Sequence, residues 1–495
     1  MKFFSSFALL FACFTTIFAQ RDYSSLYTDL PVELKQVKAP VIPDLTMKLT
    51  DFGAVGNGVD LCTDAFRKGI NALSKKGGGH LIVPAGVWLT GPIELKSNID
   101  LHLEANALVI FSPEKILFDD GDDKGRFLPL IGGTELHDVS ITGKGTLDGN
   151  GKYWRPAKRN KNSDSEWKAF NRMGGYITPK GDLWMPFNLK HFKNINLVKG
   201  DTTKAATKEE GLRNDLIRIT KSENILFEGF TAQNSPRFHV HPVKCKNVIL
   251  DGITVRCPWN AQNGDAIDLA NVQTALVVNC IVDAGDDGIC LKGGEGAKGV
   301  EAGPCSDMLI QDNIVYHAHG GLVFGSDCSG GMNKIICRRC TMSGTDVGLR
   351  FKSGLGRGGR TSQVYCHDIV MNDIKDEAIV FDCTYIDNNY KKMLEKQQAG
   401  ASAEAGMTAK KKAKQKAKED TYKLNDYAPD WQDIHIERVV CRECRYGLKT
   451  VPLVGRKCVH DVEVKDCTLF YTVKGEDVDK DSQIKTQNVR YETYK

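Results

Sequence analysis

Two adjacent carboxylates interrupt an otherwise apolar stretch of the sequence. The segment "NCIVDAGDDGICLKGG", residues 279–294, places Asp286 and Asp287 between the apolar runs "CIV" and "ICL". Neighbouring carboxylates repel and raise each other's proton affinity, so a protein keeps such a pair when it is well solvated or useful. A carboxyl group that stays protonated beside an ionised one can supply and accept protons in one reaction. The doublet is therefore a candidate for general acid–base chemistry.

Segments of similar form recur on both sides of the doublet. They read "NGDAIDL", "GDDGICL", "HGGLVFG", "DVGLRFK" and "DEAIVFD". Aligning their apolar pairs gives one column of Ile267, Ile289, Leu322, Leu349 and Ile379, and a second of Leu269, Leu291, Phe324, Phe351 and Phe381. Alternation along a strand sends both columns inward. In this register Asp265 lies on Asp287, and His319 lies on Asp286.

A second group of short β-branched runs shows what fold would hold this register. "FKNINLVKG", "SENILFEG" and "CKNVILDG" carry their Asn at 194, 224 and 247, in steps of 30 and 23 residues. Self-similarity at such a period is typical of a solenoid in which each repeat leans on its neighbours. Because the runs are short and no helical pattern separates them, the sequence predicts an all-β parallel β-helix.

Stacked coils of such a helix are about 4.8 Å apart, so Asp265 and Asp287 become neighbours and His319 follows one coil later. Strict alternation would turn both aspartates inward. We expect each strand to begin just after its aspartate, with a bend that Gly264 and Gly285 permit and that aims the carboxylates outward.

Arg350 and Lys352, in "GLRFKSG", complete the set on the same face of consecutive coils. Paired carboxylates are the working groups of glycoside hydrolysis, in which one protonates the leaving oxygen and the other activates water or attacks. Taken singly, each aspartate could simply form a turn, and the two cations could simply lie on a solvated strand face. Turn residues with no common role have no reason to share a column, which favours the catalytic reading.

The motifs also resemble a known family. "NGDAID", "GDDGICLKGG", "HGGLVFGS" and "RFKS" are similar, in order, to the four motif blocks of glycoside hydrolase family 28, the polygalacturonase family of pectin-degrading enzymes. "LTDFGAVGNG" at 49–58 resembles the entry strand of that family, and the resemblance covers roughly residues 48–480. Gly264, Ala266, Gly288 and Gly321 depart from the usual motif residues, which places the chain nearer to bacterial branches.

The resemblance implies a right-handed, single-stranded β-helix and inverting hydrolysis of α-linked galacturonides, without a metal or organic cofactor. Asp286 would be the general acid, and Asp265 and Asp287 would hold and deprotonate the attacking water. Inversion typically separates acid and base by about 6.5–9.5 Å. His319 would hold Asp286, while Arg350 and Lys352 would grip the uronate carboxylate.

Other activities remain open at this point. A relative acting on rhamnogalacturonan or another pectin side chain would use the same motifs, and loops would decide between them. A pectate lyase would need a calcium site and a cationic base in place of an acid and a water. A non-catalytic polysaccharide-binding solenoid would keep the fold alone. Long loops at 151–167 and 200–212 would close one end of a cleft, which slightly favours exo-action.

The chain divides into four parts. Residues 1–19 read as a signal peptide with cleavage near Ala19, which predicts a secreted or periplasmic protein. Residues 20–47 form an extended lead-in, and 48–495 form the β-helix domain with one short N-terminal helix at "LCTDAFRKGINALSKKGGG". A Lys- and Ala-rich insertion at about 385–427 interrupts it, as a solvated loop or as an attractor of an acidic polymer.

The charge of the chain limits the kinds of partner that we expect it to bind. The formal charge of +4 is local, since residues 391–420 hold nine Lys against four acids, and without them and Lys2 the chain carries −2. We therefore expect an acidic plant polysaccharide such as pectin or polygalacturonate as partner, with no nucleic acid, no membrane span and a monomeric chain. Two CxxC pairs, at 337–340 and 441–444, lie in strand-like sequence, where buried thiols with one or two bridges are favoured over zinc.

Overall fold

The computed structural model describes residues 21–119, 127–187, 201–385, 427–453 and 455–494. The predicted signal peptide at 1–19 lies outside these residues. So does the Lys- and Ala-rich insertion between 386 and 426. Both remain predictions.

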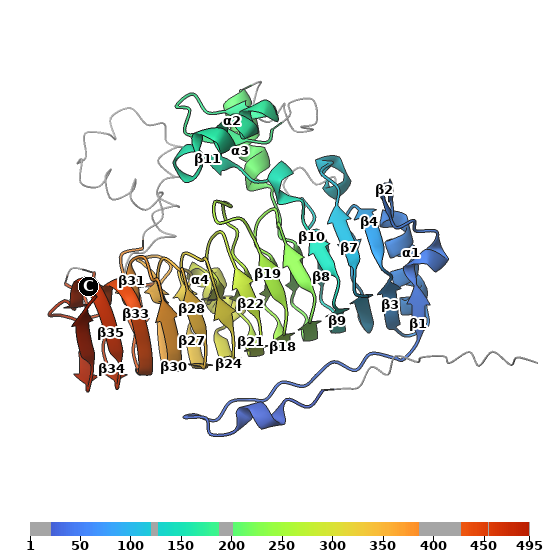
Figure 1. Ribbon diagram of the computed structural model, residues 1–495. Helices are drawn as coiled ribbons and strands as arrows, with labels where there is room; N and C mark the ends of the chain where they lie inside the picture. Colours follow the sequence, from blue (N-terminus) through green and yellow to red (C-terminus); the bar gives the residue numbers. More distant parts are fainter. Residues whose placement is uncertain (1–20, 120–126, 188–200, 386–426, 454, 495) are drawn as a thin grey trace, which may run out of the picture.

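Thirty-four strands wind into one long hydrogen-bonded coil, shown from the side in Figure 1. Each strand pairs with the equivalent strand of the next coil in parallel, as β20 (Ile267–Ala270) does with β23 (Ile289–Lys292). Buried aliphatic and aromatic side chains fill the interior along the whole coil. The predicted parallel β-helix is confirmed.

Three faces make up each coil. The first face consists of β5 (Ile93–Glu94), β8 (Ile131–Thr134), β14 (Ile217–Thr220), β17 (Val240–Val243), β20, β23, β26 (Leu322–Gly325), β29 (Leu349–Lys352) and β31 (Glu377–Asp382). The second consists of β1 (Thr46–Lys48), β3 (Gly79–Val83), β6 (Ile99–Leu103), β9 (His137–Gly143), β15 (Glu223–Glu228), β18 (Lys246–Asp251), β21 (Gln273–Val278), β24 (Cys305–Gln311), β27 (Met332–Arg338), β34 (Val462–Lys465) and β36 (Ile484–Gln487). The third consists of β2 (Asn57–Leu61), β4 (Gly86–Thr90), β7 (Ala107–Phe111), β10 (Thr146–Asp148), β16 (Thr231–Gln233), β19 (Thr254–Arg256), β22 (Ile281–Asp283), β25 (Ile314–Val315), β28 (Thr341–Ser343), β35 (Thr468–Asp477) and β37 (Arg490–Thr493). The long strands β30 (Arg360–Asn372) and β33 (Ile434–Val451) run around the corners between faces, and β32 (Asp430–Trp431) pairs with the start of β30.

The repeated asparagines mark one corner of the coil. Asn224 and Asn247 have φ of 56° and 55°, in the left-handed region that Asn tolerates better than most residues. The Asn247 side-chain amide donates to the Asn224 side-chain oxygen at 2.8 Å, so the corner is also bonded from coil to coil. This explains why the sequence repeats asparagine at that point.

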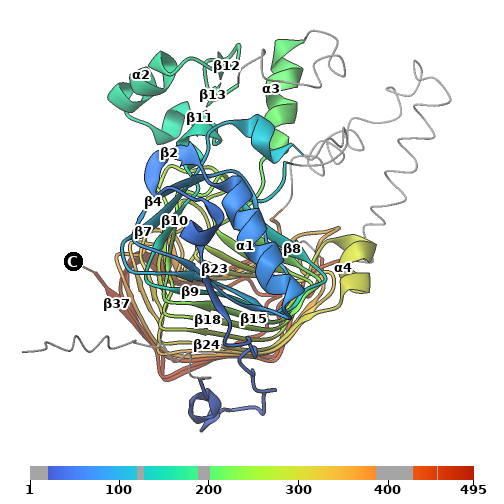
Figure 2. The ribbon, with the colours of Figure 1, turned by 90° about the vertical axis from the view of Figure 1, so that its right-hand side faces the viewer.

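Helix α1 (Thr63–Lys75) covers the N-terminal end of the coil, as Figure 2 shows, and confirms the predicted helix. Its buried face includes Phe66, Ile70 and Leu73. Three further helices were not predicted: α2 (Asp164–Arg172), α3 (Thr202–Gly211) and α4 (Gly296–Ala302). In the part of the chain that the structure describes, no helix is both long and apolar enough to cross a membrane.

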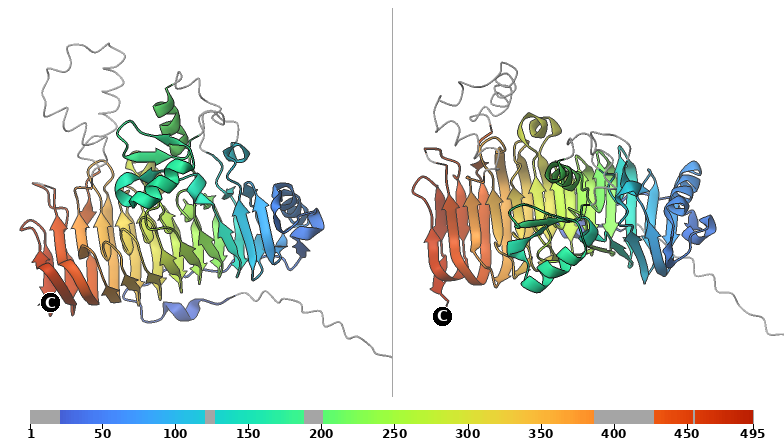
Figure 3. Two further views of the ribbon diagram at one scale, coloured as in Figure 1. Left: turned by 45° about the horizontal axis from the view of Figure 1, so that its top comes forward. Right: turned by 90° about the horizontal axis from the view of Figure 1, so that it is seen from above.

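Two of these helices lie in a small subdomain that stands above the coil in Figures 1 and 3. It contains α2, α3 and an antiparallel sheet of β11 (Ala157–Lys158), β13 (Leu183–Met185) and β12 (Tyr176–Ile177). The predicted loops at 151–167 and 200–212 are therefore wrong as loops, because a capping box at Ser163 and an aspartate cap at Asp201 start helices there.

The lead-in is a strap, residues 21–45, that runs along the second face of the coil (Figure 1). Apart from a short 3-10 turn at Ser24–Tyr27 it is extended, and β1 begins at Thr46 rather than at 48. Outward-facing apolar side chains of the second face meet the strap along one stripe, which comprises Leu226, Ile249, Leu276, Leu309 and Ile336. Tyr23, Leu34 and Val37 of the strap cover that stripe.

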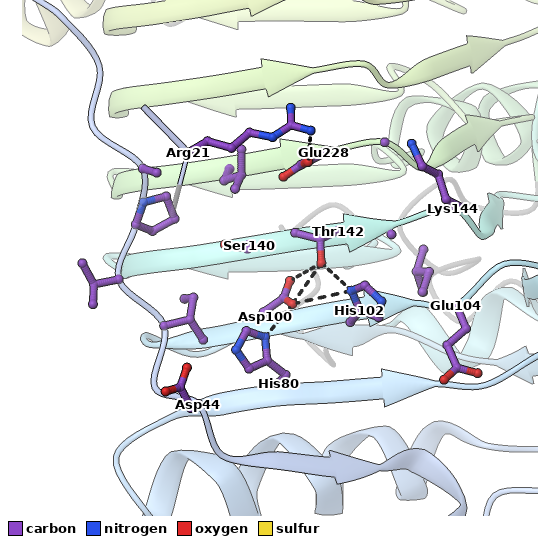
Figure 4. A pocket seen from close by; sticks show the side chains of 18 of the residues that line it. Arg21, Asp44, His80, Asp100, His102, Glu104, Ser140, Thr142, Lys144 and Glu228 are labelled. Carbon is purple, nitrogen blue, oxygen red and sulfur yellow. Dashed lines mark hydrogen bonds and ion pairs between the residues drawn. The ribbon is translucent and has the colours of Figure 1, made fainter. Parts of the chain in front are cut away.

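A hollow of about 1110 Å³ lies where the strap leaves the apolar stripe (Figure 4). Its floor is a chain of polar contacts over β3, β6 and β9. His80 Nδ1 lies 2.8 Å from a carboxylate oxygen of Asp100, Thr142 donates to the same carboxylate, and His102 Nδ1 lies 2.8 Å from Thr142 Oγ1. Burial lowers the pKa of His102. These contacts continue the row of the apolar stripe with polar residues.

Candidate active site

The predicted register is present residue for residue. Ile267 pairs with Ile289, Ile289 with Leu322, Leu322 with Leu349, and Leu349 with Ile379. The second column from Leu269 to Phe381 pairs in the same way, and all ten side chains are buried. The rings of Phe324, Phe351 and Phe381 stack inside the coil with centroids 4.3 and 4.5 Å apart.

Asp265 and Asp287 lie just before their strands, as expected, and backbone contacts hold them there. The Ala266 amide donates to the Asp287 carbonyl at 3.0 Å, and the Asp265 carbonyl accepts from the His239 amide at 2.9 Å. Both side chains are nearly buried, with 4% and 2% of each residue exposed.

The expected reason for the bend is wrong in detail. Gly264 and Gly285 do not adopt positive φ, and Asn263 with φ of 55° makes the left-handed turn instead. Glycine is required there by close packing, because a Cβ on Gly285 would lie 2.6 Å from the Pro258 carbonyl oxygen. The loop at 257–262 thus rests directly on the segment that carries Asp286.

The three aspartates do meet. One carboxylate oxygen from each of Asp265, Asp286 and Asp287 lies within 4.8 Å of the other two. The expected separation of about 6.5–9.5 Å between acid and base is therefore not found between these oxygens. The trio is a compact cluster, close enough for the three carboxyls to affect each other's titration.

The environments of the trio push protonation in opposite directions. For Asp265, burial and the neighbouring Asp268 and Asp286 raise the pKa well above its usual value, against the pull of Lys292. For Asp287, burial alone would raise the pKa, but the Lys352 ammonium at 2.6 Å and further cations outweigh it and hold the pKa far below normal. The surroundings thus favour the protonated form of Asp265 and the ionised form of Asp287.

Asp286 is the most accessible of the three, with 20% of its side chain exposed. His319 Nδ1 lies 3.0 Å from Asp286 Oδ1, and the His319 amide donates to the Asp286 carbonyl at 2.8 Å. The predicted pairing of His319 with Asp286 is therefore found in the structure.

The two cations differ from each other. Lys352 is 5% exposed and donates to Asp287, so its ammonium is already used inside the protein. Arg350 lies 3.8 Å from Asp287, donates to the His319 carbonyl at 3.2 Å and keeps 20% of its side chain exposed. The Tyr385 ring lies 5.1 Å from the Lys352 nitrogen and 5.8 Å from the Arg350 guanidinium carbon.

Four further residues belong to this site and were not predicted. Lys292 forms an ion pair with Asp268 and lies 3.5 Å from Asp265. Both lie within the motif strands β20 and β23, where the patterns "IDLA" and "ICLK" could have shown them. Lys161 of the subdomain reaches His319, with Nζ 3.2 Å from Nε2, and Trp259 is 56% exposed in the loop that rests on Gly285. Such contacts between distant segments leave no sequence pattern.

The subdomain is fixed to the same part of the coil. Arg155 donates to the Ser235 carbonyl at 2.6 Å, and the Asn260 amide donates to the Asn162 side-chain oxygen at 2.7 Å. Arg213, which follows α3, donates to the carbonyls of Pro236 and Gln262. These bonds place the subdomain over the loop that precedes Asp265.

The fold and site together define a class of protein: a parallel β-helix with a carboxylate trio on one face, in which buried charges raise the pKa of Asp265 and lower that of Asp287. The family model for glycosyl hydrolases family 28 matches residues 198–403, which include all six predicted site residues. The part of the chain that carries the candidate site thus matches this family.

Known relatives are similar in sequence to about two thirds of this chain. A probable polygalacturonase from Vitis vinifera is 31% identical over 344 residues, 66% of this chain and 61% of the relative. An exo-poly-alpha-D-galacturonosidase from Dickeya chrysanthemi is 27% identical over 69% of this chain and 58% of the relative. This chain thus spans about three fifths of these relatives' lengths. The crystal structure of a hyperthermoactive exopolygalacturonase from Thermotoga maritima superimposes with a TM-score of 0.70 at 27% identity, over 92% of this chain and 94% of that one.

Proposed function

We propose that the protein is a glycoside hydrolase that cleaves α-linked galacturonides in pectin or polygalacturonate. The observation that carries this proposal is the trio itself: the three carboxyls meet within 4.8 Å, and Asp286, the accessible one, lies beside Asp265, whose pKa is raised, and Asp287, whose pKa is lowered. Environments that split the pKa values of neighbouring carboxyls are what acid–base hydrolysis requires. The similarity to polygalacturonases supplies the substrate class.

Each residue has one role in the proposed reaction. Asp286, the accessible carboxyl, donates its proton to the glycosidic oxygen as the bond to the anomeric carbon breaks. Water attacks that carbon from the opposite side and gives a proton to the Asp287 carboxylate, while Asp265 holds the water. The short spacing of the trio then lets the proton return to Asp286.

Inversion is the stereochemical outcome we propose, although the cluster is compact. Asp287 is a poor nucleophile, because Lys352 donates to Oδ2 at 2.6 Å and neutralises its charge. Proton NMR of the first product tests this: inversion of an α-linkage yields the β-anomer first, whereas an initial α-anomer would show retention and contradict the proposed water attack.

The substrate is held by its carboxylates. Arg350 is the exposed cation beside the trio and would bind a uronate carboxylate in a bidentate manner. Lys352 donates to Asp287, so it attracts the uronate carboxylate from behind Asp287 and does not bind it directly. This revises its expected role as a direct ligand of that carboxylate. Exo-action is proposed because the subdomain, fixed to the loop before Asp265, stands at one side of the trio.

We further propose that the protein is exported, on the basis of the leader sequence at 1–19, and that it acts as a monomer without a metal or organic cofactor. N-terminal sequencing of the protein recovered from its host medium or periplasm checks the export: a mature chain that starts near Gln20 is expected.

Product analysis tests the activity directly. The protein is incubated with polygalacturonate and, separately, with rhamnogalacturonan, and products are sized over time. Monomer alone from the start indicates exo-action, and a ladder of oligomers indicates endo-action. Unsaturated products would identify a lyase instead. Asp286→Asn should lose at least about 100-fold in kcat, whereas Asp283→Asn, a carboxylate three residues earlier whose side chain is 44% exposed, should not. Full activity in Asp286→Asn would overturn the assignment.

A further inference from the structure

Lys161 brings the subdomain into contact with the candidate active site. It is the last residue of the 3-10 turn η5 (Arg159–Lys161), and its Nζ lies 3.2 Å from His319 Nε2. The next residue, Asn162, is nearly buried and is bonded to Asn260 and to the Lys158 carbonyl. The chain that carries Lys161 is therefore held in place next to His319.

The chemistry of the two groups fixes the direction of this bond. A lysine ammonium has three donors and no acceptor, so His319 Nε2 must accept. A neutral imidazole that accepts at one nitrogen carries its proton on the other. That other nitrogen, Nδ1, lies 3.0 Å from Asp286 Oδ1, so a proton on Nδ1 sits beside the carboxyl.

We propose that Lys161 is a positioning residue that sets the tautomer of His319 and thereby determines which oxygen of Asp286 carries the transferable proton. Because a proton on Nδ1 occupies the side of the carboxyl next to Oδ1, the acidic proton is then placed on Oδ2. This role rests on the proposed function of Asp286 as the acid.

The remaining charges around His319 explain why the lysine is needed. Asp346 Oδ2 lies 3.9 Å from His319 Nε2, and it is paired with Lys375 at 3.2 Å. Without Lys161, Nε2 can carry the proton toward Asp346, and Nδ1 then becomes an acceptor. The Asp286 proton would be drawn to Nδ1 instead of to the glycosidic oxygen. Lys158, a cation close to Lys161, is exposed.

Three variants separate this role from a merely structural one. Lys161→Met removes the donor, Lys161→Arg restores one, and Lys158→Met is the matched control on the same turn. The His319 tautomer is read from ¹⁵N chemical shifts of the histidine rings at neutral pH without substrate, with the signal assigned by its loss in His319→Gln. The wild type, Lys161→Arg and Lys158→Met should show the proton on Nδ1, and Lys161→Met should show it on Nε2.

Kinetics on polygalacturonate give the second readout. Lys161→Met should lower kcat about 10- to 100-fold and leave KM within about twofold, because proton transfer and not binding is impaired. Lys161→Arg should recover most of kcat, and Lys158→Met should match the wild type. A wild-type proton on Nε2, or a Lys161→Met variant with an unchanged tautomer and kcat, would overturn the role of Lys161. A wild type that does not hydrolyse polygalacturonate would overturn the proposed function, while the tautomer measurement still tests the bond.

Discussion

Replacing Lys352 by Met is expected to destabilise the protein more than removing the whole ion pair does. Lys352 and Asp287 are 5% and 2% exposed and lie 2.6 Å apart. With an effective dielectric constant of about 20, their attraction is about 6 kcal/mol. Arg350, 3.8 Å from Asp287, remains and compensates part of the lost charge. The free energy of unfolding should therefore fall by about 3–5 kcal/mol, the range for an unpaired buried charge.

The double variant Lys352→Met/Asp287→Asn removes the stranded charge as well. It should recover at least half of the loss, because a neutral pair carries no buried charge. Lys449→Met is the control, since Lys449 pairs with Glu377 at a similar 2.7 Å but has 25% of its side chain exposed. That pair should contribute at most about 1 kcal/mol.

Urea unfolding at pH 7 and pH 5, followed by fluorescence and circular dichroism, measures these differences. In the wild type the depressed pKa of Asp287 contributes stability above the unfolded value of about 3.9, so this contribution is present at both pH values. Without Lys352, burial favours the protonated form, so the Lys352→Met variant should lose less at pH 5 than at pH 7. Wild-type stability in Lys352→Met, or a double variant weaker than the single one, would refute the reasoning.

Three further predictions concern other parts of the molecule. Trp259→Ala should raise KM for polygalacturonate about tenfold and leave kcat nearly unchanged, because its exposed indole, in the loop that rests on Gly285, offers a face to a sugar ring; equal KM values would contradict this. Burial lowers the pKa of His239 to about 4, so its unfolded form takes up a proton first as pH falls from about 6.5, and stability should drop by about 2 kcal/mol between pH 7 and pH 5. His239→Gln should lose that slope in urea unfolding, and a slope equal to the wild type would exclude His239 as its source. Leu276→Asn should weaken the packing of the strap on the coil by about 2 kcal/mol. Residues 21–45 should then be cleaved in limited proteolysis, and unchanged protection would show that the apolar stripe does not hold the strap.

The sequence was sufficient to predict the coil and its register because every coil repeats the same physical requirement. Inward pairs such as Ile267 and Leu269 recur at one point of each turn, and asparagines such as Asn247 recur at a corner that needs positive φ. The subdomain has no repeat, so its segments read as loops. Its helix α2 begins at a capping box, a local feature that belongs to no repeat.

The site divides in the same way. Asp265, Asp286, Asp287 and His319 came together as predicted because register alone aligns them. The burial of Lys352 could not be predicted, since alternation gives the face of a side chain and not the depth at which its ammonium ends. Lys161 was missed because its contact joins segments 158 residues apart without any periodic relation.

The strap imposes an order on how the molecule is completed. Its residues leave the ribosome before any strand of the coil, yet its binding surface extends from Leu226 on β15 to Ile336 on β27. The full docking surface of the strap therefore exists only after more than three hundred residues have been synthesised. Folding from the N-terminus can form the early coils, but the strap cannot dock completely at that stage. The apolar side chains of Tyr23, Leu34 and Val37 therefore stay accessible to chaperones until late in synthesis.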